Sequence, residues 1–426
     1  MVSFRLMSAL RDIGIDARML VAEKLTDSEH VGLIGGSLGR KLAFAADRLP
    51  VALANGFDRG TLFKIDTAFA GVDISNHRWV KEADVVCLNW VNQGVLGLGN
   101  IKRLLKKGKR LVWTMHDMWN MTGICHHAGS CSRFMIEGKE GFDVAQNVSY
   151  GNGHVERFGC GRCPLLGERG GEKDMSWQTF ERKRKLYKDS GIRFVAVSSW
   201  LAQKGRESLL LGNQDVSVIP NAFPMGEEPE WRELKEGDEV RLAFGAARLD
   251  DDIKCFPVLV ESMRSLRREY PELAGRVRLV LFGGIRNKHL LNGIEVEYEY
   301  KGVLKDKEEI RRLYSESDIV ISTSSYETLP GTLIEGQANG CFPVSFNRGG
   351  QRDIIEQEVT GYMAEWADNA AEGGRRIAAG IAFGVDRLQK EGRGLRKAMR
   401  ESVEKRFGAE SVAQRYERLF TEMFKR

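Results

Sequence analysis

Two glutamates mark the stretch of this sequence best suited to chemistry. Glu327 lies in a polar loop after a short apolar run, and Glu335 follows eight positions later, inside a helix predicted to begin near residues 330–331. Carboxylates at this spacing could hold the hydroxyl groups of a ligand on either side of the helix start. Hydrolysis by paired carboxylates is a competing chemistry. It is disfavoured here because the two glutamates flank a helix start instead of facing each other.

The start of this helix is predicted to bind an anion. Proline is favoured at the beginning of a helix, and the first N–H groups have no partner inside it. Such groups point toward the carboxyl end of the sheet, where open α/β folds bind anions. They belong to Gly331, Thr332 and Leu333. An anion receptor between two hydroxyl-binding carboxylates matches the order of groups in a nucleotide diphosphate sugar.

Basic residues that could neutralise a pyrophosphate occur earlier in the chain. Arg248 and Lys254 follow the apolar run 240–246. Arginine can bind two oxygens of such a group at once. Fixed cations beside a departing diphosphate also assist its departure, because negative charge develops there in the transition state.

A second group of candidates follows an apolar run in the first half of the chain. His116 and Asp117 come directly after residues 110–115, and a histidine at the end of a strand could position a hydroxyl group. Three tryptophans could line a binding cleft, although we expect at least two of them to pack in the core. They are Trp90, Trp113 and Trp119.

Composition indicates a globular protein with two domains. The chain has 426 residues, 42% hydrophobic and 29% charged, and this length exceeds what one core usually supports. The net charge of +5 fits an anionic substrate or membrane surface and is too small to argue for nucleic acid. Because no apolar run approaches a bilayer-spanning length and no signal peptide opens the sequence, we expect a cytoplasmic location.

Apolar runs that read as strands alternate with helical patterns in both halves. The predicted strands are 17–22, 84–89, 110–115, 193–197, 216–219, 240–246, 278–282, 318–322 and 341–346. The predicted helices are 1–13, 101–107, 177–188, 200–211, 256–270, 307–315, 333–339, 370–388 and 409–424. This alternation predicts an α/β protein with two parallel-sheet, Rossmann-like domains facing across a cleft.

The predicted domain boundaries follow the composition. The N-terminal domain covers 1–222, with a cysteine-bearing insertion at 118–172. An acidic linker, 223–239, contains two prolines and no core pattern, and the C-terminal domain covers 240–407. The final helix, 408–426, is expected to pack back on the N-terminal domain.

The chain opens with a helix, which is unusual for this class. A doubly wound domain normally opens with a central strand and a glycine-rich turn. We therefore expect that the first strand is missing from this sequence and lies in a longer reading frame upstream.

Four cysteines in the insertion predict a structural zinc site. They are Cys125, Cys131, Cys160 and Cys163. The second pair has C-x2-C spacing, which lets two thiolates reach one tetrahedral zinc ion, and His126 and His127 are substitute ligands. Four reduced thiols, or a reversible disulfide within the second pair, are the alternatives.

Together these features resemble the retaining glycosyltransferases of family 4, which have the GT-B fold. The resemblance covers nearly the whole chain. It rests on the glutamate, seven residues, glutamate pattern and on further motifs at predicted strand ends. These are Arg248 with Lys254, His116–Asp117, Ile219–Pro220–Asn221, Gly349–Gly350 and Gly361–Tyr362.

The resemblance implies a role for each candidate residue. Glu335 would hold the nucleotide ribose, and Glu327 would contact the sugar and support a developing oxocarbenium ion. His116 would position a hydroxyl group near the transferred sugar. Arg248 and Lys254 would serve the diphosphate, so no divalent metal is expected at the reaction centre.

The resemblance also implies the reaction and its setting. A sugar would move from a UDP- or GDP-linked donor, bound by the C-terminal domain, to a hydroxyl group of a saccharide or lipid-linked acceptor on the N-terminal side. Polysaccharide, lipopolysaccharide or capsule assembly is the expected context. The basic runs 102–110 and 182–185 could meet anionic lipid headgroups at the inner membrane, although a solvated helix face is the more common role of such runs. A sugar-nucleotide epimerase and a catalytically silent nucleotide-binding scaffold remain alternatives.

Overall fold

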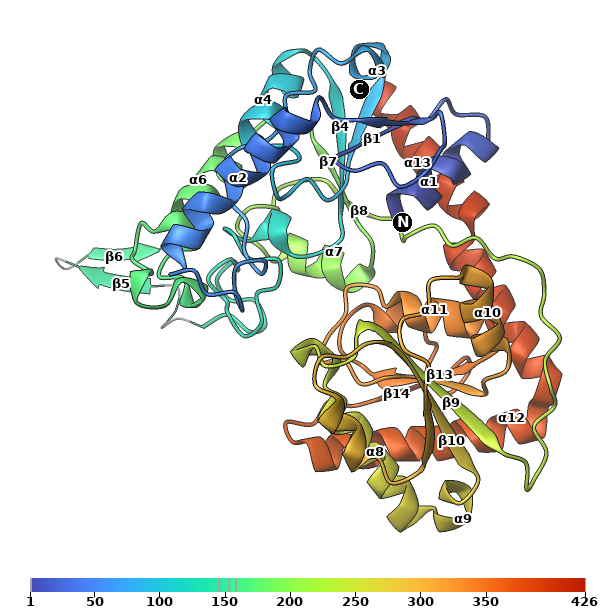
Figure 1. Cartoon of the computed structure of the whole chain (residues 1–426). Helices are drawn as coiled ribbons and strands as arrows, with labels where there is room; N and C mark the ends of the chain where they lie inside the picture. The colour runs from blue at the N-terminus through green and yellow to red at the C-terminus, as the bar shows by residue number, and fades with distance from the viewer. Residues whose placement is uncertain (1, 144–145, 147, 152–153, 158, 426) are drawn as a thin grey trace. The chain divides into compact units, whose positions relative to one another are not determined.

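The chain folds into two compact units (Figure 1). The computed structural model describes residues 2–143, 146, 148–151, 154–157 and 159–425. Unit 1 comprises Met1–Pro220 with Ala413–Arg426, and unit 2 comprises Asn221–Val412. All strand pairs described in the two larger sheets are parallel, which confirms the predicted α/β class.

Unit 1 contains a four-stranded sheet, ordered β3-β4-β7-β8, and a separate two-stranded sheet, β1-β2. The strands are β1 (Met19–Val21), β2 (Val31–Leu33), β3 (Val85–Leu88), β4 (Arg110–Met115), β7 (Arg193–Ala196) and β8 (Val216–Val218). The helices are α1 (Val2–Asp12), α2 (Ser37–Ala54), α3 (Arg78–Glu82), α4 (Leu98–Lys106), α6 (Met175–Tyr187), α7 (Ser199–Arg206) and most of α13 (Ala409–Phe424). The sequence predicted neither β2 nor α2.

The two sheets of unit 1 are not joined by a ladder within the described residues. There β1 pairs only with β2, and β3 pairs only with β4. The residues of β1 are half-buried, as are most of those in β3, whereas β4 is buried from Leu111 to Met115. The expected additional first strand stays a prediction.

Aromatic side chains fill the core beside β4. Trp113 stacks on Phe194 of β7 with ring centroids 6.1 Å apart, and Tyr187 packs edge-on against both rings. Trp119 lies 6.0 Å from Trp113. Both tryptophans are fully buried, as expected for at least two of the three.

The C-terminal helix is anchored to unit 1 at both ends of β4. The Tyr416 hydroxyl lies 2.8 Å from Thr114 Oγ1 in a buried hydrogen bond. Arg110 Nε donates to the Met423 carbonyl at 3.1 Å, and its guanidinium lies over the Phe424 ring. These contacts account for the assignment of residues from Ala413 onward to unit 1.

The predicted insertion 118–172 is irregular but packed where it is described. It contains η1 (Trp119–Met121), an antiparallel hairpin of β5 (Val148–Gly151) and β6 (His154–Arg157), and η2 (Pro164–Arg169). Ile124 and Met121 are fully buried. Residues 144–145, 147, 152–153 and 158 of this segment lie outside the described part of the chain.

Unit 2 is built on a six-stranded sheet ordered β11-β10-β9-β12-β13-β14. The strands are β9 (Val240–Arg248), β10 (Val277–Gly284), β11 (Glu297–Tyr300), β12 (Ile319–Ser322), β13 (Phe342–Phe346) and β14 (Tyr362–Ala364). Its helices are α8 (Phe256–Glu269), α9 (Pro271–Ala274), α10 (Lys307–Ser315), α11 (Gly331–Ala338) and α12 (Ala370–Phe407), with short turns η3 (Asp252–Lys254), η4 (Lys288–Gly293) and η5 (Gly350–Asp353).

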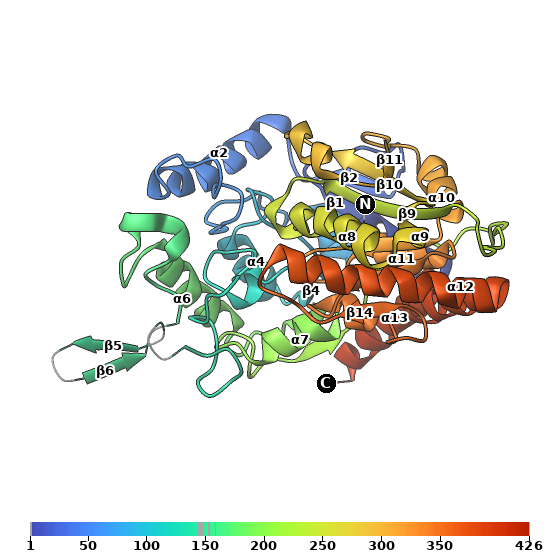
Figure 2. The ribbon, with the colours of Figure 1, turned by 90° about the horizontal axis from the view of Figure 1, so that it is seen from below.

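Helices α8 and α12 lie side by side in unit 2 (Figure 2). A Cβ at Gly374 would lie 2.5 Å from the backbone carbon of Glu261, so a glycine is needed for this close approach. Helix α12 continues well past the predicted end at residue 388, bending at Gly392, whose φ is 51°. No helix in the described part of the chain is long and apolar enough to span a bilayer.

The acidic segment 223–239, predicted as a linker, packs on unit 2. Leu234 is buried in the core of this unit. Trp231 Nε1 donates to the Asn339 carbonyl at 2.7 Å. A single leucine among charged residues gives no periodic pattern, so sequence reasoning missed this contact.

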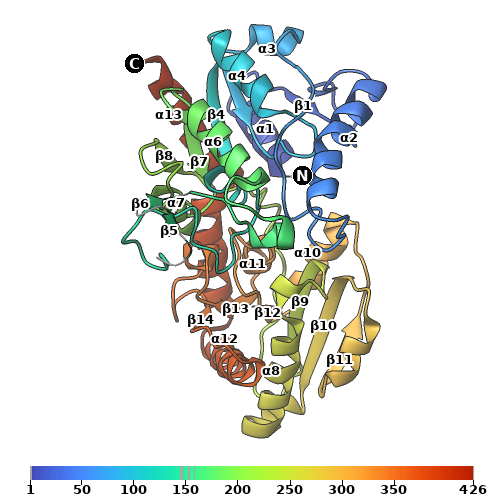
Figure 3. The same cartoon turned by 90° about the vertical axis from the view of Figure 1, so that its left-hand side faces the viewer.

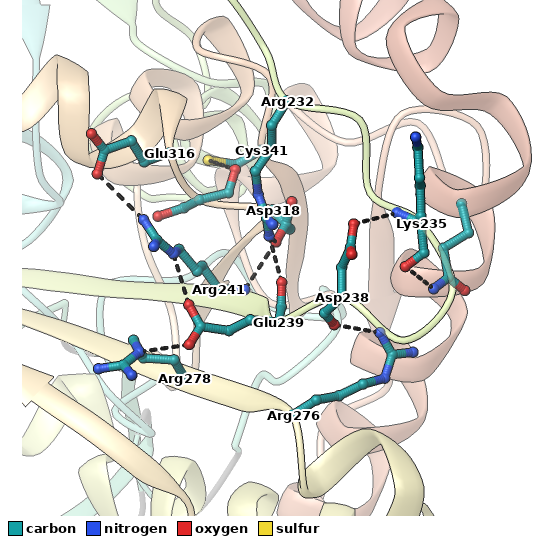
Figure 4. Close-up of polar contacts among 12 residues, drawn as sticks. Arg232, Lys235, Asp238, Glu239, Arg241, Arg276, Arg278, Glu316, Asp318 and Cys341 are labelled. Atoms are coloured by element: carbon teal, nitrogen blue, oxygen red, sulfur yellow. Dashed lines mark hydrogen bonds and ion pairs between the residues drawn. The ribbon is translucent and has the colours of Figure 1, made fainter.

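A buried cluster of charged side chains lies at the amino end of β12 (Figure 4). Asp318 is completely buried and accepts hydrogen bonds from Arg396 Nη2 at 2.7 Å and from the Arg241 N–H at 2.9 Å. Arg232 also donates to Asp318, and Figure 4 shows Arg232 and Arg241 approaching it from different segments. Arg396, which is 1% exposed, donates in addition to the Gly340 carbonyl at 2.8 Å.

Replacement of Arg396 by methionine should destabilise unit 2 strongly. Removing one partner of a buried ion pair costs about 3–5 kcal/mol, because the remaining charge stays buried. Arg393→Met is the control, since the Arg393 side chain is 71% exposed in its pair with Glu228, and exposed pairs contribute at most about 1 kcal/mol. Urea unfolding followed by tryptophan fluorescence measures both variants; equal midpoints would contradict the prediction.

Candidate functional site

The sheet of unit 2 reverses its strand order between β9 and β12. Strand β9 pairs with β10 from Val240 onward, but it pairs with β12 only through Leu242–Ile319 and Ala243–Val320. The two strands therefore separate before their carboxyl ends. In open α/β sheets, ligands bind in the crevice at such a switch point.

Loops from both sides meet over this opening. Lys254 comes from η3, after β9, and Glu327 comes from the loop after β12. The Lys254 ammonium forms an ion pair with Glu327 Oε1, which also accepts a hydrogen bond from Ser324 Oγ at 2.9 Å. Thr323 Oγ1 donates to the Lys254 carbonyl at 2.7 Å and ties the two loops together. Both charged side chains are partly exposed, so a ligand can reach the pair.

The Gly349–Gly350 motif supports Glu327 from the end of β13. The Gly350 N–H donates to the Glu327 carbonyl at 2.8 Å. Gly349 has a φ of 135°, and a Cβ at this position would lie 2.2 Å from the same carbonyl oxygen. Only glycine permits this approach.

Helix α11 begins at Gly331, with Pro330 as its N-cap. Within the described residues, the N–H groups of Gly331 and Thr332 have no hydrogen-bond acceptor, whereas Leu333 donates to the Pro330 carbonyl at 3.2 Å. The prediction of three unpaired N–H groups is therefore wrong for Leu333, because the first turn closes on Pro330. Two N–H groups remain for an anion.

Glu335 lies one helical turn after Gly331 on α11 and is half-buried. Gly336 brings the helix against β12, since a Cβ there would lie 2.6 Å from the Val320 side chain. Burial, and then the nearby charge of Glu335, raises the pKa of the Tyr314 hydroxyl well above its ordinary value. That hydroxyl is buried and has no hydrogen-bond partner in the described structure.

Arg248 is the last residue of β9 and faces acidic residues of its own loop. Its Nη2 lies 3.0 Å from Asp251 Oδ2, and its Nε lies 3.5 Å from Asp250 Oδ1. The side chain is 39% exposed. The structure thus pairs Lys254 with Glu327 and places Arg248 at the same end of the sheet, without a direct contact between the two cations in the described interactions.

Unit 1 carries a second polar cluster at the adjacent carboxyl ends of β3 and β4. His116 Nε2 lies 3.0 Å from Asn89 Oδ1. Burial lowers the pKa of His116, against the opposing effect of the Asp117 charge, and so favours the neutral ring. His126 Nδ1 lies 2.7 Å from Asp117 Oδ2. Burial acts to raise the pKa of Asp117, but hydrogen bonds from His126 and the Trp119 N–H help to hold it below its ordinary value.

A buried carboxylate, which the sequence analysis missed, organises the loops around this cluster. Asp66 Oδ2 accepts hydrogen bonds from Arg48 Nη2 at 2.7 Å and from the Gln93 N–H at 2.9 Å. The Asp66 carbonyl accepts one from Trp119 Nε1 at 2.7 Å. Asp66 therefore joins α2, the loop after β3 and the start of the insertion. Nothing in the local sequence pattern distinguishes it from a surface aspartate.

A buried lysine holds the first turn of the insertion. Lys183, which is completely buried, donates to the carbonyls of Trp119, Thr122 and Gly123 at 2.5, 3.1 and 2.9 Å. Its ammonium lies 3.2 Å from the centre of a ring of Trp119. Burial lowers the pKa of Lys183 to about 7.

The four insertion cysteines lie close enough together to influence one another's pKa values. Burial is the main reason that the pKa of Cys125 is raised to about 11 and that of Cys163 to about 12, and the neighbouring thiols contribute to both shifts. Cys160 Sγ accepts a hydrogen bond from the Gly123 N–H at 3.0 Å. All four are free thiols. Among the described residues, no group of three or more histidine, cysteine, aspartate or glutamate side chains is arranged so that it could hold a metal ion.

Comparison with known proteins identifies a domain in unit 2. Residues 241–379 match the family described as Glycosyl transferases group 1. This range contains the switch point, both glutamates and both cations of the site described above. Unit 1 lies outside the matched range.

Two curated proteins are similar over part of the chain. One, from Escherichia coli (strain K12), is named WcaC and described as a colanic acid biosynthesis glycosyl transferase; it is 22% identical over 278 residues. The other, 24% identical over 169 residues, is spore coat protein SA of Bacillus subtilis (strain 168). The matches cover 62% and 37% of this chain but only 59% and 42% of the two relatives.

Solved structures share the fold at low sequence identity. A glycosyltransferase from Rickettsia africae ESF-5 is 16% identical with a TM-score of 0.58, covering 100% of this chain and 94% of its own. Sucrose-phosphate synthase from Thermosynechococcus elongatus is 16% identical with a TM-score of 0.61, covering 99% and 92%. Anabaena Alr3699/HepE, solved in complex with UDP, is 14% identical with a TM-score of 0.58, covering 99% and 96%. These likenesses support two Rossmann-like domains of the GT-B type.

Proposed function

We propose that the protein is a retaining glycosyltransferase that moves a sugar from a nucleotide diphosphate donor to a hydroxyl group. The observation that carries this proposal is the switch point of unit 2, where Lys254, Glu327 and the start of α11 surround one opening. This opening lies within the range matched by Glycosyl transferases group 1. Nothing among the described residues favours the epimerase or the silent scaffold.

The donor diphosphate would bind at the start of α11. The N–H groups of Gly331 and Thr332 can donate to its oxygens, and Lys254 and Arg248 add positive charge. Glu335, one turn further along the helix, would accept hydrogen bonds from the ribose hydroxyls. UDP is the favoured nucleotide, since it is the ligand in the Anabaena HepE structure; GDP is the alternative.

Donor binding would exchange the partner of Lys254. Without a donor its ammonium is neutralised by Glu327, and a diphosphate of higher charge would compete for it. Glu327 would then be released to contact the sugar. In the transfer step the bond from the anomeric carbon to the diphosphate oxygen breaks, with its electrons leaving on the diphosphate. The acceptor oxygen bonds to the same face of that carbon, and its proton leaves with the diphosphate.

The acceptor would bind in unit 1, where the neutral ring of His116 can accept or donate a hydrogen bond. A saccharide or lipid-linked saccharide is the proposed acceptor. Polysaccharide assembly is the proposed context, because WcaC is described with colanic acid biosynthesis. The cations of unit 2 serve the diphosphate in this scheme, so the reaction centre needs no divalent metal.

A structural zinc ion is proposed for the insertion. Four thiols are a complete ligand set for zinc, and the Gly123 N–H that reaches Cys160 Sγ would stabilise a thiolate there. Lys183 supplies positive charge in the same neighbourhood, opposite in sign to a zinc–thiolate centre. The thiols are not grouped as ligands in the structure, so zinc binding would have to draw them together.

Peripheral contact with an anionic membrane is proposed for one side of unit 1, and the chain would then act at the cytoplasmic face of the inner membrane. Helices α2, α4 and α6 lie on this side (Figure 3). A shallow hollow of about 490 Å³ between α4 and α6 is lined by Lys102, Lys106, Lys109, Lys185 and Lys188. On α2, Leu38, Leu42, Leu49 and Leu53 form a stripe with each side chain 54–71% exposed. Lysines attract anionic headgroups, and an apolar stripe gains from entering the interface.

Substitutions in unit 2 should separate donor binding from transfer. Lys254→Ala should weaken UDP binding about 10- to 100-fold, because a charge-assisted hydrogen bond is lost. Glu327→Gln should keep UDP affinity but lower sugar transfer at least about 100-fold, since the developing positive charge loses its carboxylate. Calorimetry with UDP and a donor screen for released nucleotide diphosphate measure the two effects.

The matched control for that experiment is Lys390→Ala, an exposed cation on α12 of the same unit. It should bind UDP like the wild type. Equal UDP affinity in Lys254→Ala, Lys390→Ala and wild type would place the nucleotide elsewhere and refute the donor site.

Metal analysis tests the cysteine site. The purified chain should contain zinc in a stoichiometric amount, and Cys163→Ser should lose most of it, because three thiolates hold zinc less tightly than four. Cys87→Ser, outside the insertion, should retain the metal. A metal-free protein in which all four insertion thiols react with a thiol reagent would exclude the site.

Vesicle co-sedimentation tests the membrane surface. The chain should bind phosphatidylglycerol vesicles and not phosphatidylcholine vesicles, and Lys102→Glu with Lys106→Glu should abolish binding by reversing the local charge. Each lysine near an anionic surface contributes about 1 kcal/mol. The control reverses two exposed lysines of unit 2, Lys390 and Lys397. Equal loss in both pairs would mean that net charge alone governs binding.

A further inference from the structure

Trp90 is an exposed aromatic side chain beside the polar cluster of unit 1. It lies two residues after the end of β3 and is 45% exposed, unlike the two buried tryptophans near β4. Its ring centroid lies 5.8 Å from that of His126, with the planes 34° apart. The indole therefore has one side against a histidine that is paired with Asp117 and much of its surface open to solvent.

The loop that carries Trp90 is held rigidly from inside. The Gln93 N–H donates to the buried Asp66 carboxylate, and Gln93 has a left-handed φ of 56°. A Cβ at Gly94 would lie 2.5 Å from the Phe44 backbone nitrogen, so this loop sits directly on α2. An exposed tryptophan on a fixed loop is a preorganised surface, whereas one on a mobile tip would lose side-chain freedom on binding.

His126 beside this ring, and residues close to Trp90 in the chain or in the loop of Asp66, carry hydrogen-bonding groups that lack protein partners. His126 uses Nδ1 toward Asp117, and its Nε2 has no partner in the described part of the chain. Asn89 uses its side-chain oxygen toward His116, which leaves its amide N–H groups for a ligand. In the same loops, Asn92 Nδ2 and Thr67 Oγ1 are buried without a hydrogen-bond partner. Such groups destabilise the folded chain unless water or a ligand completes their hydrogen bonds.

We propose that Trp90, with His126 and Asn89, forms an acceptor subsite that holds a neutral sugar ring. The apolar C–H face of a pyranose would lie on the indole, and its hydroxyl groups would reach His126 Nε2 and the Asn89 amide. This matches the usual design of a small-molecule site, an apolar surface with a few placed polar groups. The assignment of this sugar as the acceptor rests on the proposed glycosyltransferase function.

Saturation-transfer NMR on the full chain tests the subsite directly. The probes are the methyl α-glycosides of glucose, galactose and mannose, with UDP present in every sample. In the wild type, saturation should be strongest on the ring protons of one sugar face. Trp90→Ala should reduce it about fivefold or more, and Trp90→Phe should retain most of it, because phenylalanine keeps an apolar aromatic face for the C–H groups of the sugar.

The control is Phe63→Ala, which removes an aromatic side chain of unit 1 that is 56% exposed and should leave the sugar signal unchanged. A wild type without saturation of any of the three glycosides, or equal signals in Trp90→Ala and wild type, would overturn the subsite. The UDP protons report separately on unit 2. Absence of saturation on the UDP protons in the wild type would refute the donor proposal. The comparison of sugar signals between wild type and Trp90→Ala would still test the subsite.

Discussion

The short pairing between β9 and β12 is the constraint on which the geometry of unit 2 depends. Leu242 and Ala243 fix the register with β12, and beyond them each strand continues beside a different neighbour. No backbone ladder connects the loops that follow these two strands. The loops are held together by individual polar contacts. The Lys254–Glu327 ion pair is one, and the Ser325 N–H donating to the Ile253 carbonyl at 2.9 Å is another. The two side chains of this ion pair can exchange partners when a ligand binds. The backbone hydrogen bonds of a ladder cannot.

The two ends of β12 illustrate how burial decides what a charge can do. At the amino end, Asp318 and Arg396 are almost completely inaccessible, and breaking this pair would leave a buried charge. At the carboxyl end, Lys254 and Glu327 keep 28% and 19% of their side chains exposed. Water or a ligand can replace either partner there at much lower cost. The ion pair at the amino end of β12 therefore serves stability, whereas the ion pair at its carboxyl end can exchange partners.

The sequence predicted the fold class and most core strands because these rest on local apolar runs. It missed α2 for a physical reason: Asp47 and Arg48 face the interior of unit 1, while leucines face outward. This inverts the rule on which helical periodicity depends. The sequence placed Glu327 and Lys254 at strand ends, but their direct contact depends on how β9 and β12 separate, which no local pattern encodes. The unpaired N–H of Leu333 was mispredicted because the conformation of Pro330 decides how the first turn closes.

Unit 1 shows why its site was harder to predict than that of unit 2. Its loops run without strands or helices over long stretches, so many backbone carbonyls have no regular partner. Lys183 satisfies three of them at once, from a position about 60 residues further along the chain. The Asp66 carboxylate likewise accepts hydrogen bonds from the N–H groups of Ala68 and Gln93. Burying an ammonium and a carboxylate is costly, but leaving several backbone groups unsatisfied would cost more. Irregular loops fixed by buried ions can hold Trp90 in one orientation at the surface, and this rigidity is what an exposed aromatic side chain needs to act as a binding surface.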